Sequence, residues 1–503
     1  MKTPDDIEDD EYESSNPGDY YPSRQHSIVK PLLAEEVEVT NHPTEQQNTT
    51  IYTNTGNSLM LYLKAAVIFY FAAVDLLSYT IIQPFLPQYL LSKFPDTVNE
   101  DNSGTYVGVI LGTFFVARFF SNTFIGHLSD RVGRKVLMIV SLLVSTIATG
   151  AFTFLPTIWL VIVFRMAHGF FSATSALSKV MLIDISTGNN IPVATRSLLF
   201  AYLGSTFAMS RAASSAMGGI IVGIGAALKS KNPYLIACIV ATILIFVGFI
   251  FSLIMPETHT IEARELNRQQ ELVSADSDKE QKSILSKLYN LFFEKTRSKL
   301  FIMFLINSMC NASCFLMWVL VSQADVDHGG FSFDSLRTGF LFAIYGVFAV
   351  GFQLLFFKRV MTYFNLLKTF KIGSVFQMAQ NTIFAFIVMV NRQLRDNPAQ
   401  PYVLWTLLTV FCLITAMGFM MTLNVLQSMI VNATDKTHQG LVQGVSESIA
   451  TAARAIGPII FGYLLSQSIV VFNTSLPVSL LLILLYGLSM IISVWLEKKN
   501  VDN

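Results

Sequence analysis

Charged side chains are scarce in this chain of 503 residues, where Asp, Glu, Lys and Arg together make up 14% and hydrophobic residues 52%. Soluble domains carry about 25% charged residues, so the deficit indicates that lipid is the main solvent. The 34 basic and 34 acidic residues give a formal net charge of +0. That balance gives no reason to expect a nucleic-acid partner.

Cysteine is also sparse, and all four cysteines fall inside apolar runs: Cys238, Cys310, Cys314 and Cys412. Disulfides are expected in exposed loops of an oxidising compartment, so we predict none. Cys310 and Cys314 lie one helical turn apart, which would suit a metal, but small packing residues in a helix have the same spacing. We adopt the packing interpretation and predict no metal site.

Signatures of enzymes are missing as well. The chain has no nucleotide-binding P-loop, no HExxH helix and no nucleophile elbow. This disfavours catalysis and ATP-driven transport, and we expect no cofactor.

What the chain does have is long apolar runs. A membrane-spanning helix needs about 20 mostly apolar residues, and inside the bilayer each run must be a helix that satisfies its own backbone. Twelve such runs are predicted, near 60–83, 105–126, 135–155, 158–181, 197–224, 233–255, 299–322, 337–357, 366–391, 401–430, 441–468 and 475–496.

Two polar stretches organise these runs. Residues 1–58 are polar and open acidic, so we predict a disordered tail with no cleavable signal peptide, and the first span must direct insertion. Residues 257–298 are rich in Glu, Lys, Gln and Ser and divide the spans six and six. The predicted parts are the tail 1–58, a bundle 59–256, a linker 257–298, a bundle 299–496 and a C-terminus 497–503.

Basic residues mark one side of the membrane. They concentrate in 131–135, in the linker and in 358–368, whereas the loops facing the other way carry few. The positive-inside rule therefore puts both termini and the linker in the cytoplasm. The sequon Asn473-Thr474-Ser475 then falls in a non-cytoplasmic loop, where used and unused sequons are both compatible with the sequence.

An internal repeat supports the division into two halves. Arg211 and Gly219 in the fifth span correspond to Arg454 and Gly462 in the eleventh at one constant offset. Such repeats are typical of transporters built from two related bundles.

Residues 126–135, Gly-His-Leu-Ser-Asp-Arg-Val-Gly-Arg-Lys, form a charged hairpin between two spans. They closely resemble the loop between the second and third helices of the major facilitator superfamily. The resemblance implies an all-α membrane protein with twelve transmembrane helices in two six-helix bundles. The gate residues that it implies are Gly126, Asp130, Arg131, Gly133, Arg134, Lys135 and Asp184.

In that family, Asp130 would meet the start of the eleventh span, and the basic cluster would meet Asp184 at the end of the fourth. Such contacts form in one state and break in the other, which suits a bistable transporter. The alternative is that the basic residues are a positive-inside topology signal only.

Asp75 is an intramembrane carboxylate. The stretch from Asp75 to Pro84-Phe85-Leu86-Pro87 resembles the first helix of tetracycline/proton antiporters, and the eleventh span also resembles that branch. A desolvated carboxylate can carry a proton, so Asp75 is our candidate for proton coupling. The alternative is a salt bridge to Arg118 or another base, and the two interpretations can hold in different states.

Arg165, followed by Gly169, resembles the family's fourth-helix motif, in which the arginine is linked to proton transfer. A buried arginine must face the protein interior and find a partner. We therefore predict that Arg165 lies beside Asp75 and tunes its proton; a fixed ion pair between helices is the alternative. His168, one turn away, could titrate, but we expect a packed neutral histidine.

Bases outnumber acids among the deep charges. Asp75 and Glu447 stand against the four arginines Arg118, Arg165, Arg211 and Arg454. Arg118, Arg211, Glu447 and Arg454 are predicted to carry substrate or cavity charge. The excess hints at an organic anion, unless some arginines reach towards the membrane surface.

These observations favour a multi-pass secondary transporter of a small organic solute that works by alternating access, most simply proton-coupled antiport. An organic-anion symporter or facilitator is the alternative, and a non-transporting sensor on the same fold is the third. We expect a monomer in the plasma membrane or an endolysosomal or vacuolar membrane.

Overall fold

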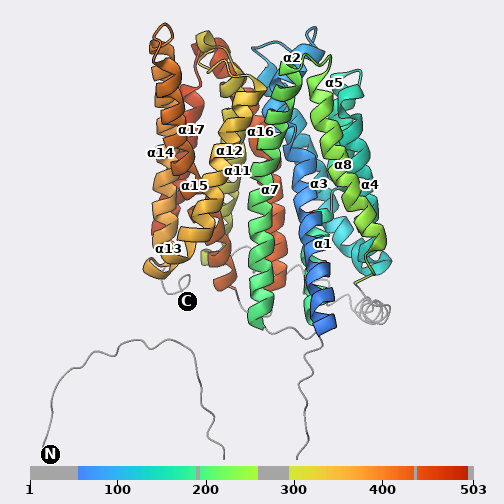
Figure 1. Cartoon of the computed structure of the whole chain (residues 1–503). Coiled ribbons are helices and arrows are strands. Elements are labelled where there is room, and N and C mark those ends of the chain that lie inside the picture. Colours follow the sequence, from blue (N-terminus) through green and yellow to red (C-terminus); the bar gives the residue numbers. More distant parts are fainter. Residues whose placement is uncertain (1–54, 189–192, 259–293, 435–438, 497–503) are drawn as a thin grey trace, which may run out of the picture. The chain divides into compact units, whose positions relative to one another are not determined.

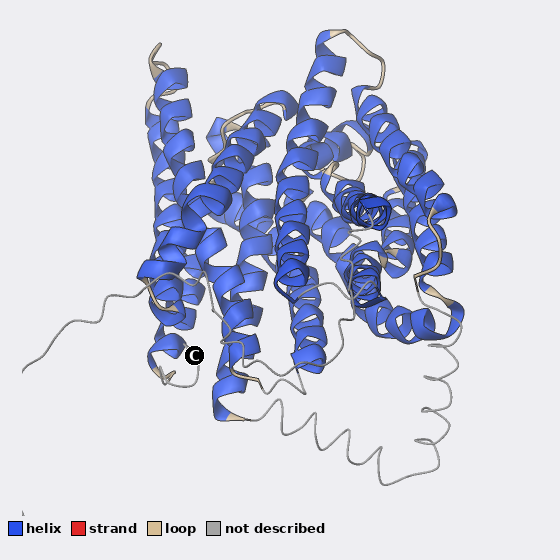
Figure 2. Ribbon diagram, turned by 60° about the horizontal axis from the view of Figure 1, so that its bottom comes forward, coloured by secondary structure: helices blue, strands red, loops and turns tan. Residues whose placement is uncertain are grey.

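Long helices run side by side through the molecule (Figure 1). The computed structural model describes residues 55–188, 193–258, 294–434 and 439–496. The predicted tail up to residue 54, most of the linker and the last residues lie outside them. The described residues form helices and loops without a strand, as Figure 2 shows.

In the first half of the chain, the described residues 55–188 and 193–258 form seven α-helices longer than ten residues, with shorter segments between them. The elements are α1 (Thr55–Thr80), η1 (Gln83–Phe85), α2 (Leu86–Lys93), α3 (Ser103–Val132), α4 (Arg134–Ala151), η2 (Phe152–Phe154), α5 (Ile158–Phe171), α6 (Thr174–Gly188), α7 (Val193–Ala227) and α8 (Pro233–Ile254).

The second half, from residue 294, repeats this plan. Its elements are α11 (Lys295–Gln323), η3 (Val326–His328), α12 (Ser335–Gly351), the π-helical turn η4 (Phe352–Phe356), α13 (Phe357–Tyr363), α14 (Leu366–Gln393), α15 (Gln400–Asn432), α16 (Gln439–Phe472) and α17 (Leu476–Val494).

Twelve segments of the described chain are long and apolar enough to cross a membrane, and each overlaps one predicted span. The prediction of an all-α protein with twelve spans is confirmed. Large apolar side chains such as Phe120, Val347 and Leu484 are exposed on the outside, as expected where the surrounding solvent is lipid rather than water.

Two spans of the described chain are interrupted. In the first, α1 ends at Thr80, and Pro84 and Pro87 start η1 and α2, because proline is best tolerated in the first turn of a helix. In the fourth, α5 ends at Phe171 and α6 begins at Thr174.

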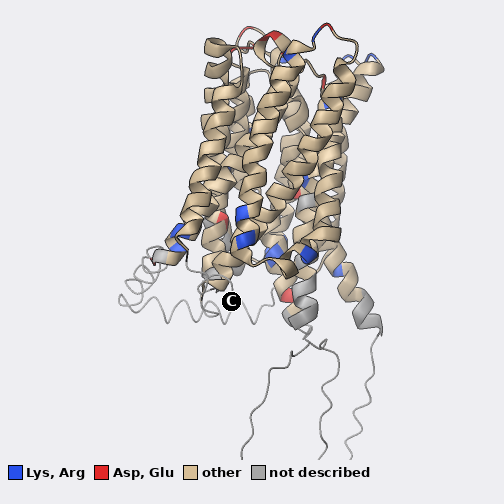
Figure 3. Ribbon diagram, turned by 90° about the vertical axis from the view of Figure 1, so that its left-hand side faces the viewer, with Lys and Arg blue, Asp and Glu red and all other residues tan. Residues whose placement is uncertain are grey.

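We call the end at which α1 begins and α17 ends the proximal end, and the opposite end, with α2 and η3, the distal end (Figure 1). The two halves meet mainly through α3 against α16 and α7 against α12. Figure 3 shows that most of the helical length carries no charge and that Lys and Arg gather towards the proximal end.

Candidate functional site

The buried carboxylate Asp75 lies in α1, where it is only 2% exposed. Arg118 in α3 donates from Nη2 to Asp75 Oδ2 at 3.0 Å, and the Ser172 hydroxyl donates to Oδ1 at 2.9 Å. An ionised carboxylate removed from water needs such donors, because an unpaired buried charge is costly. The salt bridge between Asp75 and Arg118, one of the two interpretations of Asp75, is present in the structure.

Ser172 reaches Asp75 because the fourth span is broken at that point. The freed backbone N–H of Ala173 donates to Ser141 Oγ at 3.0 Å, and the hydroxyls of Ser141 and Thr174 are 2.8 Å apart. Arg118 also donates to Ser175 in α6. Non-helical backbone is tolerated at membrane depth when protein groups satisfy it, and interrupted helices often mark the binding sites of transporters.

Arg165 is buried in α5 but does not contact Asp75. Its Nη2 donates to the backbone carbonyl of Tyr79 at 3.3 Å, and Nη1 lies 3.3 Å from His168 Nδ1. Its guanidinium carbon lies 5.3 Å from the centroid of the Phe114 ring. Arg165 therefore holds the helix that carries Asp75 rather than the carboxylate itself, and its role in tuning the proton stays a prediction. Helical spacing predicts how deep a residue lies, whereas the direction of its side chain depends on neighbouring helices.

Another ion pair, unlike that of Asp75 with Arg118, connects the first half of the chain to the second. Lys179 in α6 donates to Glu447 in α16, with Nζ 2.7 Å from Oε1, and both side chains are partly exposed. Lys179 Nζ also lies 5.7 Å from the ring centroid of Phe207 in α7.

Arg211 and Arg454 occupy equivalent places in the two halves, on α7 and α16. Both side chains are partly exposed. The guanidinium carbon of Arg211 lies 5.8 Å from the ring centroid of Phe315 in α11. Arg454 lies close enough to Arg211 and Glu447 for their charges to interact.

The predicted gate is a helix end rather than an extended hairpin. α3 continues to Val132, and only Gly133 leaves the helix, with φ 108° and ψ 153°. Such a positive φ favours glycine. Arg134 forms an ion pair with Asp184 and donates to the carbonyl of Val180 at 3.3 Å.

Some gate residues can be placed only in part. Gly126 and Asp130 belong to the last turns of α3, but their side chains lie outside the described residues. The contact expected between Asp130 and the start of the eleventh span therefore stays a prediction. Arg131 is exposed, and Lys135 is partly buried.

An acid that the sequence analysis did not select completes this region. Glu257 Oε1 accepts the backbone N–H groups of Arg134 at 3.2 Å and Lys135 at 3.4 Å. The carboxylate thereby caps the N-terminus of α4, where backbone donors and the helix dipole favour negative charge. Together with the Arg134–Asp184 pair, it ties the ends of the fourth and sixth spans to the turn.

The distal end is closed by contacts between the halves. A Cβ added to Gly108 of α3 would collide with the Pro458 carbonyl of α16, and Gly219 of α7 packs as closely on Gly339 of α12. Small residues let helices approach to backbone contact.

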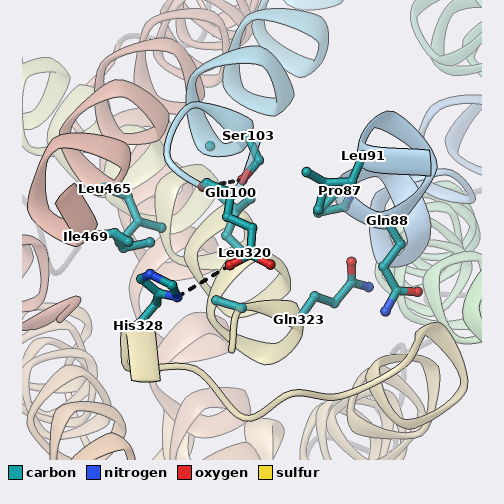
Figure 4. Close-up of a pocket in the computed structure, with 12 residues that line it drawn as sticks. Pro87, Gln88, Leu91, Glu100, Ser103, Leu320, Gln323, His328, Leu465 and Ile469 are labelled. Carbon is teal, nitrogen blue, oxygen red and sulfur yellow. Dashed lines mark hydrogen bonds and ion pairs between the residues drawn. The ribbon is translucent and has the colours of Figure 1, made fainter. Parts of the chain in front are cut away.

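Side chains around a small distal cleft reinforce this closure (Figure 4). His328 Nδ1 lies 3.4 Å from Glu100 Oε2, and Gln88 donates to the carbonyl of Phe333 at 3.1 Å. Gln323 in turn donates to the carbonyl of Pro84.

The four cysteines are buried thiols. Cys314 contacts the Asn381 and Gln380 amides and the Tyr486 hydroxyl at 3.5, 3.6 and 3.8 Å. The residues that the structure describes contain no group of three or more His, Cys, Asp or Glu able to hold a metal. The environment of Cys314 is thus one of amides and a phenol.

Three residues in these contacts were not predicted from the sequence. Lys179 had a usable signal, since it is a lysine inside a predicted span. Glu257 also had one, as an acid directly after the sixth span. Ser172 had none, because serine is common in membrane helices and its role depends on the break beside it.

Comparison with known proteins decides the family. Residues 68–458 match the Major Facilitator Superfamily, which is well over half of the chain. The chain belongs to this superfamily. The fold, the broken helices and the gate region described above are therefore those of a major facilitator transporter.

Curated relatives of this chain include several tetracycline resistance proteins. The class H tetracycline resistance protein of Pasteurella multocida is 25% identical over 403 residues, covering 80% of this chain and 89% of the relative. The class B protein of Escherichia coli is 23% identical over 405 residues, covering 80% and 87%. The resemblance to the tetracycline-transporter branch is confirmed.

Solved structures share the fold. A D-xylose-proton symporter matches with a TM-score of 0.64 and 12% identity, over 88% of this chain and 100% of that one. The human organic anion transporter MFSD10 (TETRAN) matches with a TM-score of 0.54 and 17% identity, over 86% and 99%. This major facilitator protein is thus a multi-pass membrane transporter of small molecules, and its family points to transport rather than catalysis.

Proposed function

We propose that this protein is a proton-coupled antiporter of a small organic solute and that Asp75 takes up and releases the proton. The observation that carries the proposal is the buried arrangement of Asp75, Arg118 and Ser172 at the break in the fourth span. The names of the curated relatives, tetracycline resistance proteins, support export of an organic solute.

Protonation of Asp75 would change the contacts of Arg118. A neutral carboxyl holds a guanidinium less strongly than a carboxylate does, so Arg118 would become free to turn to another acceptor. Glu447 in α16 already lies close enough to interact with the charge of Arg118. Because α3 packs along α16, a proton on Asp75 would strengthen the contact between the two halves.

Arg165 would contribute to coupling as a positioning residue. It holds the Tyr79 carbonyl, four residues after Asp75, at the C-terminal end of α1. A cation there satisfies a backbone acceptor that the helix leaves open. Arg165 would thereby fix the segment of α1 that carries the carboxylate.

The gate region would stabilise one closed state. The contacts of Arg134 with Asp184 and of Glu257 with the start of α4 are electrostatic and lie at the proximal end. Gly126, Asp130, Arg131, Gly133 and Lys135 would complete the same element. Discrete contacts of this kind, made in one state and broken in the other, produce bistable switching.

The orientation follows from the basic residues at the proximal end. We propose that both termini are cytoplasmic, that the membrane is the plasma membrane or an endolysosomal or vacuolar membrane, and that the protein works as a monomer without nucleic acid. Asn473 is exposed at the opposite end, where it would be available for glycosylation.

A second candidate is symport or facilitated diffusion of an organic anion. It is favoured by the excess of arginine over carboxylate in the centre of the molecule. A sensor without transport ranks last, since the superfamily to which the chain belongs is one of transporters.

The test is proton movement in proteoliposomes that contain a pH-sensitive dye. Tetracycline, the cationic dye pyronin Y and the anionic dye fluorescein are added under an imposed pH gradient. Proton release driven by any of these solutes in the wild type, and lost in Asp75→Asn, supports antiport through Asp75. Solute flux that stays coupled to protons in Asp75→Asn contradicts it.

The matched control is Asp396→Asn, a carboxylate in the exposed loop between α14 and α15. It removes the same charge far from the buried site, so coupled flux should persist. Fluorescein uptake that proceeds equally with and without the gradient would instead favour facilitated anion diffusion.

A further inference from the structure

Apart from Arg165, which holds the Tyr79 carbonyl, the described residues place two acids and four bases at the centre of the molecule. Each acid already has a base: Asp75 is paired with Arg118, and Glu447 with Lys179. The two remaining bases are Arg211 and Arg454, one on each half.

Neither of these two arginines has a hydrogen bond or an ion pair within the part of the chain that the structure describes. Arg211 lies over the face of Phe315, and Arg454 interacts with the charge of Glu447, which is already engaged by Lys179. Both guanidiniums are partly exposed, and their like charges repel each other across the two halves. Two neighbouring positive charges at membrane depth favour the binding of a negatively charged group.

We propose that Arg211 and Arg454 together form an anion-binding clamp, and that the solute carried is an organic anion held between the two halves. This inference rests on the proposed transport function, and it adds the charge of the substrate. A guanidinium presents paired donors that match the oxygens of a carboxylate or sulfonate.

The surroundings of Arg211 fix the position of its guanidinium. The Phe315 ring packs against Trp318 and Tyr345, with centroids 4.8 and 5.4 Å apart, and all three rings are buried. Arg211 therefore rests on a rigid aromatic cluster. The clamp defines the anionic group of the solute, and aromatic carboxylates and sulfonates serve as probes of it.

Placement on opposite halves gives the anion a mechanical role. Without it, repulsion between Arg211 and Arg454 opposes close approach of the two halves. A bound anion removes that repulsion and is contacted from both sides, so it would stabilise the occluded state. A ligand shifts such an equilibrium only through its different affinity for the two states, and a site shared by both halves provides that difference.

The experiment is fluorescence polarisation of two xanthene dyes with the purified full-length protein in detergent, at fixed ionic strength and with no gradient. Fluorescein is the anion, and pyronin Y is the cation of similar ring frame. The wild type should bind fluorescein more tightly than pyronin Y. Arg211→Gln and Arg454→Gln should each weaken fluorescein binding by about tenfold or more, as expected when a charged hydrogen bond is lost.

Two further variants separate a clamp from a structural role. Arg454→Lys keeps the charge and should retain part of the affinity, so a general folding defect can be recognised. Glu447→Gln removes a competing negative charge and frees Lys179, and it should tighten fluorescein binding. A merely structural pair of arginines would not produce this opposite sign.

The results that overturn the clamp are equally definite. Fluorescein that binds no more tightly than pyronin Y, or with unchanged affinity in both glutamine variants, contradicts it. The clamp is also contradicted if naphthalenesulfonate does not raise the unfolding temperature of the wild-type protein. Dye binding is measured without a gradient and proton coupling with one, so failure of proton coupling and failure of the clamp remain distinguishable.

Discussion

Glu257 caps the helix that begins at Arg134, because its carboxylate accepts the first backbone N–H groups of α4. Gly133, which precedes that helix, has no side chain to do so. The residue that ends the sixth span therefore holds the turn between the second and third spans.

Removal of this cap should destabilise the proximal end. Glu257→Ala is expected to lower the free energy of unfolding by about 1 kcal/mol, the usual cost of a lost N-terminal cap. Thermal unfolding in detergent measures the effect. The neighbouring variant Thr258→Ala is the control, since the Thr258 hydroxyl has no hydrogen-bond partner among the described residues. Equal destabilisation by both changes would show that the cap is not the cause.

Glycines between the halves should act on conformation rather than on folding. A methyl group at Gly108 would collide with the Pro458 backbone and prevent distal closure. Gly108→Ala should abolish transport while its thermal stability stays near that of the wild type. A maleimide should react faster with Leu91→Cys, in the distal cleft, in this background.

Two other glycines provide the comparison for Gly108. Gly444 has open space around it, so Gly444→Ala should transport normally. Gly169 lies against the backbone of Phe114 within the same half, so Gly169→Ala should lower folding stability instead. Wild-type transport by Gly108→Ala would refute the role of this close approach.

The ion pair between Lys179 and Glu447 predicts a charge-swap rescue. Because both side chains are partly exposed, the coupling free energy should be modest, about 0.2–1 kcal/mol. Lys179→Glu and Glu447→Lys should each slow transport, and the double variant should recover part of it. Thermal unfolding of the four proteins gives the double-mutant cycle. A double variant no better than the worse single one would exclude direct pairing.

The loop before α12 predicts a pH effect on stability. The Ser332 hydroxyl and the Val326 N–H hold the pKa of Asp325 below its usual range. The stabilisation is therefore complete above the pKa of the unfolded carboxyl, about 3.9, and is lost as pH falls through the lower folded value. Wild-type protein should lose stability over that interval, and Asp325→Asn should lose less.

Ser332→Ala provides the companion measurement for Asp325. It removes the donor with the largest effect on that carboxyl, so its acid-induced loss should lie between those of the wild type and Asp325→Asn. Identical acid profiles for all three proteins would rule out a contribution from Asp325.

The gate region shows which features the local sequence predicts and which it does not. The residues 126–135 indicate a turn, and the structure places it at Gly133, where φ is positive. The preceding residues nevertheless stay helical to Val132, because charged residues tolerate a helix end well and only the glycine requires another conformation. The capping role of Glu257 depends on two spans far apart in sequence.

For the buried charges, too, the sequence predicts one property and the tertiary structure decides another. Burial of Asp75 and Arg165 follows from their places in apolar runs. Their contacts do not, since Arg165 holds the Tyr79 carbonyl and Arg118 holds the carboxylate. A small change in helix rotation would exchange such partners while leaving the hydropathy pattern unchanged.

The sequence by itself determined the membrane class, the twelve spans, the repeat and the superfamily, because lipid forces each apolar run to be a helix. Only the tertiary structure decided which of the described charges meet: Asp75 pairs with Arg118, Lys179 pairs with Glu447, and Arg211 lies near the like charge of Arg454. Hydropathy depends on composition along one helix, whereas these contacts depend on the rotation and packing of several.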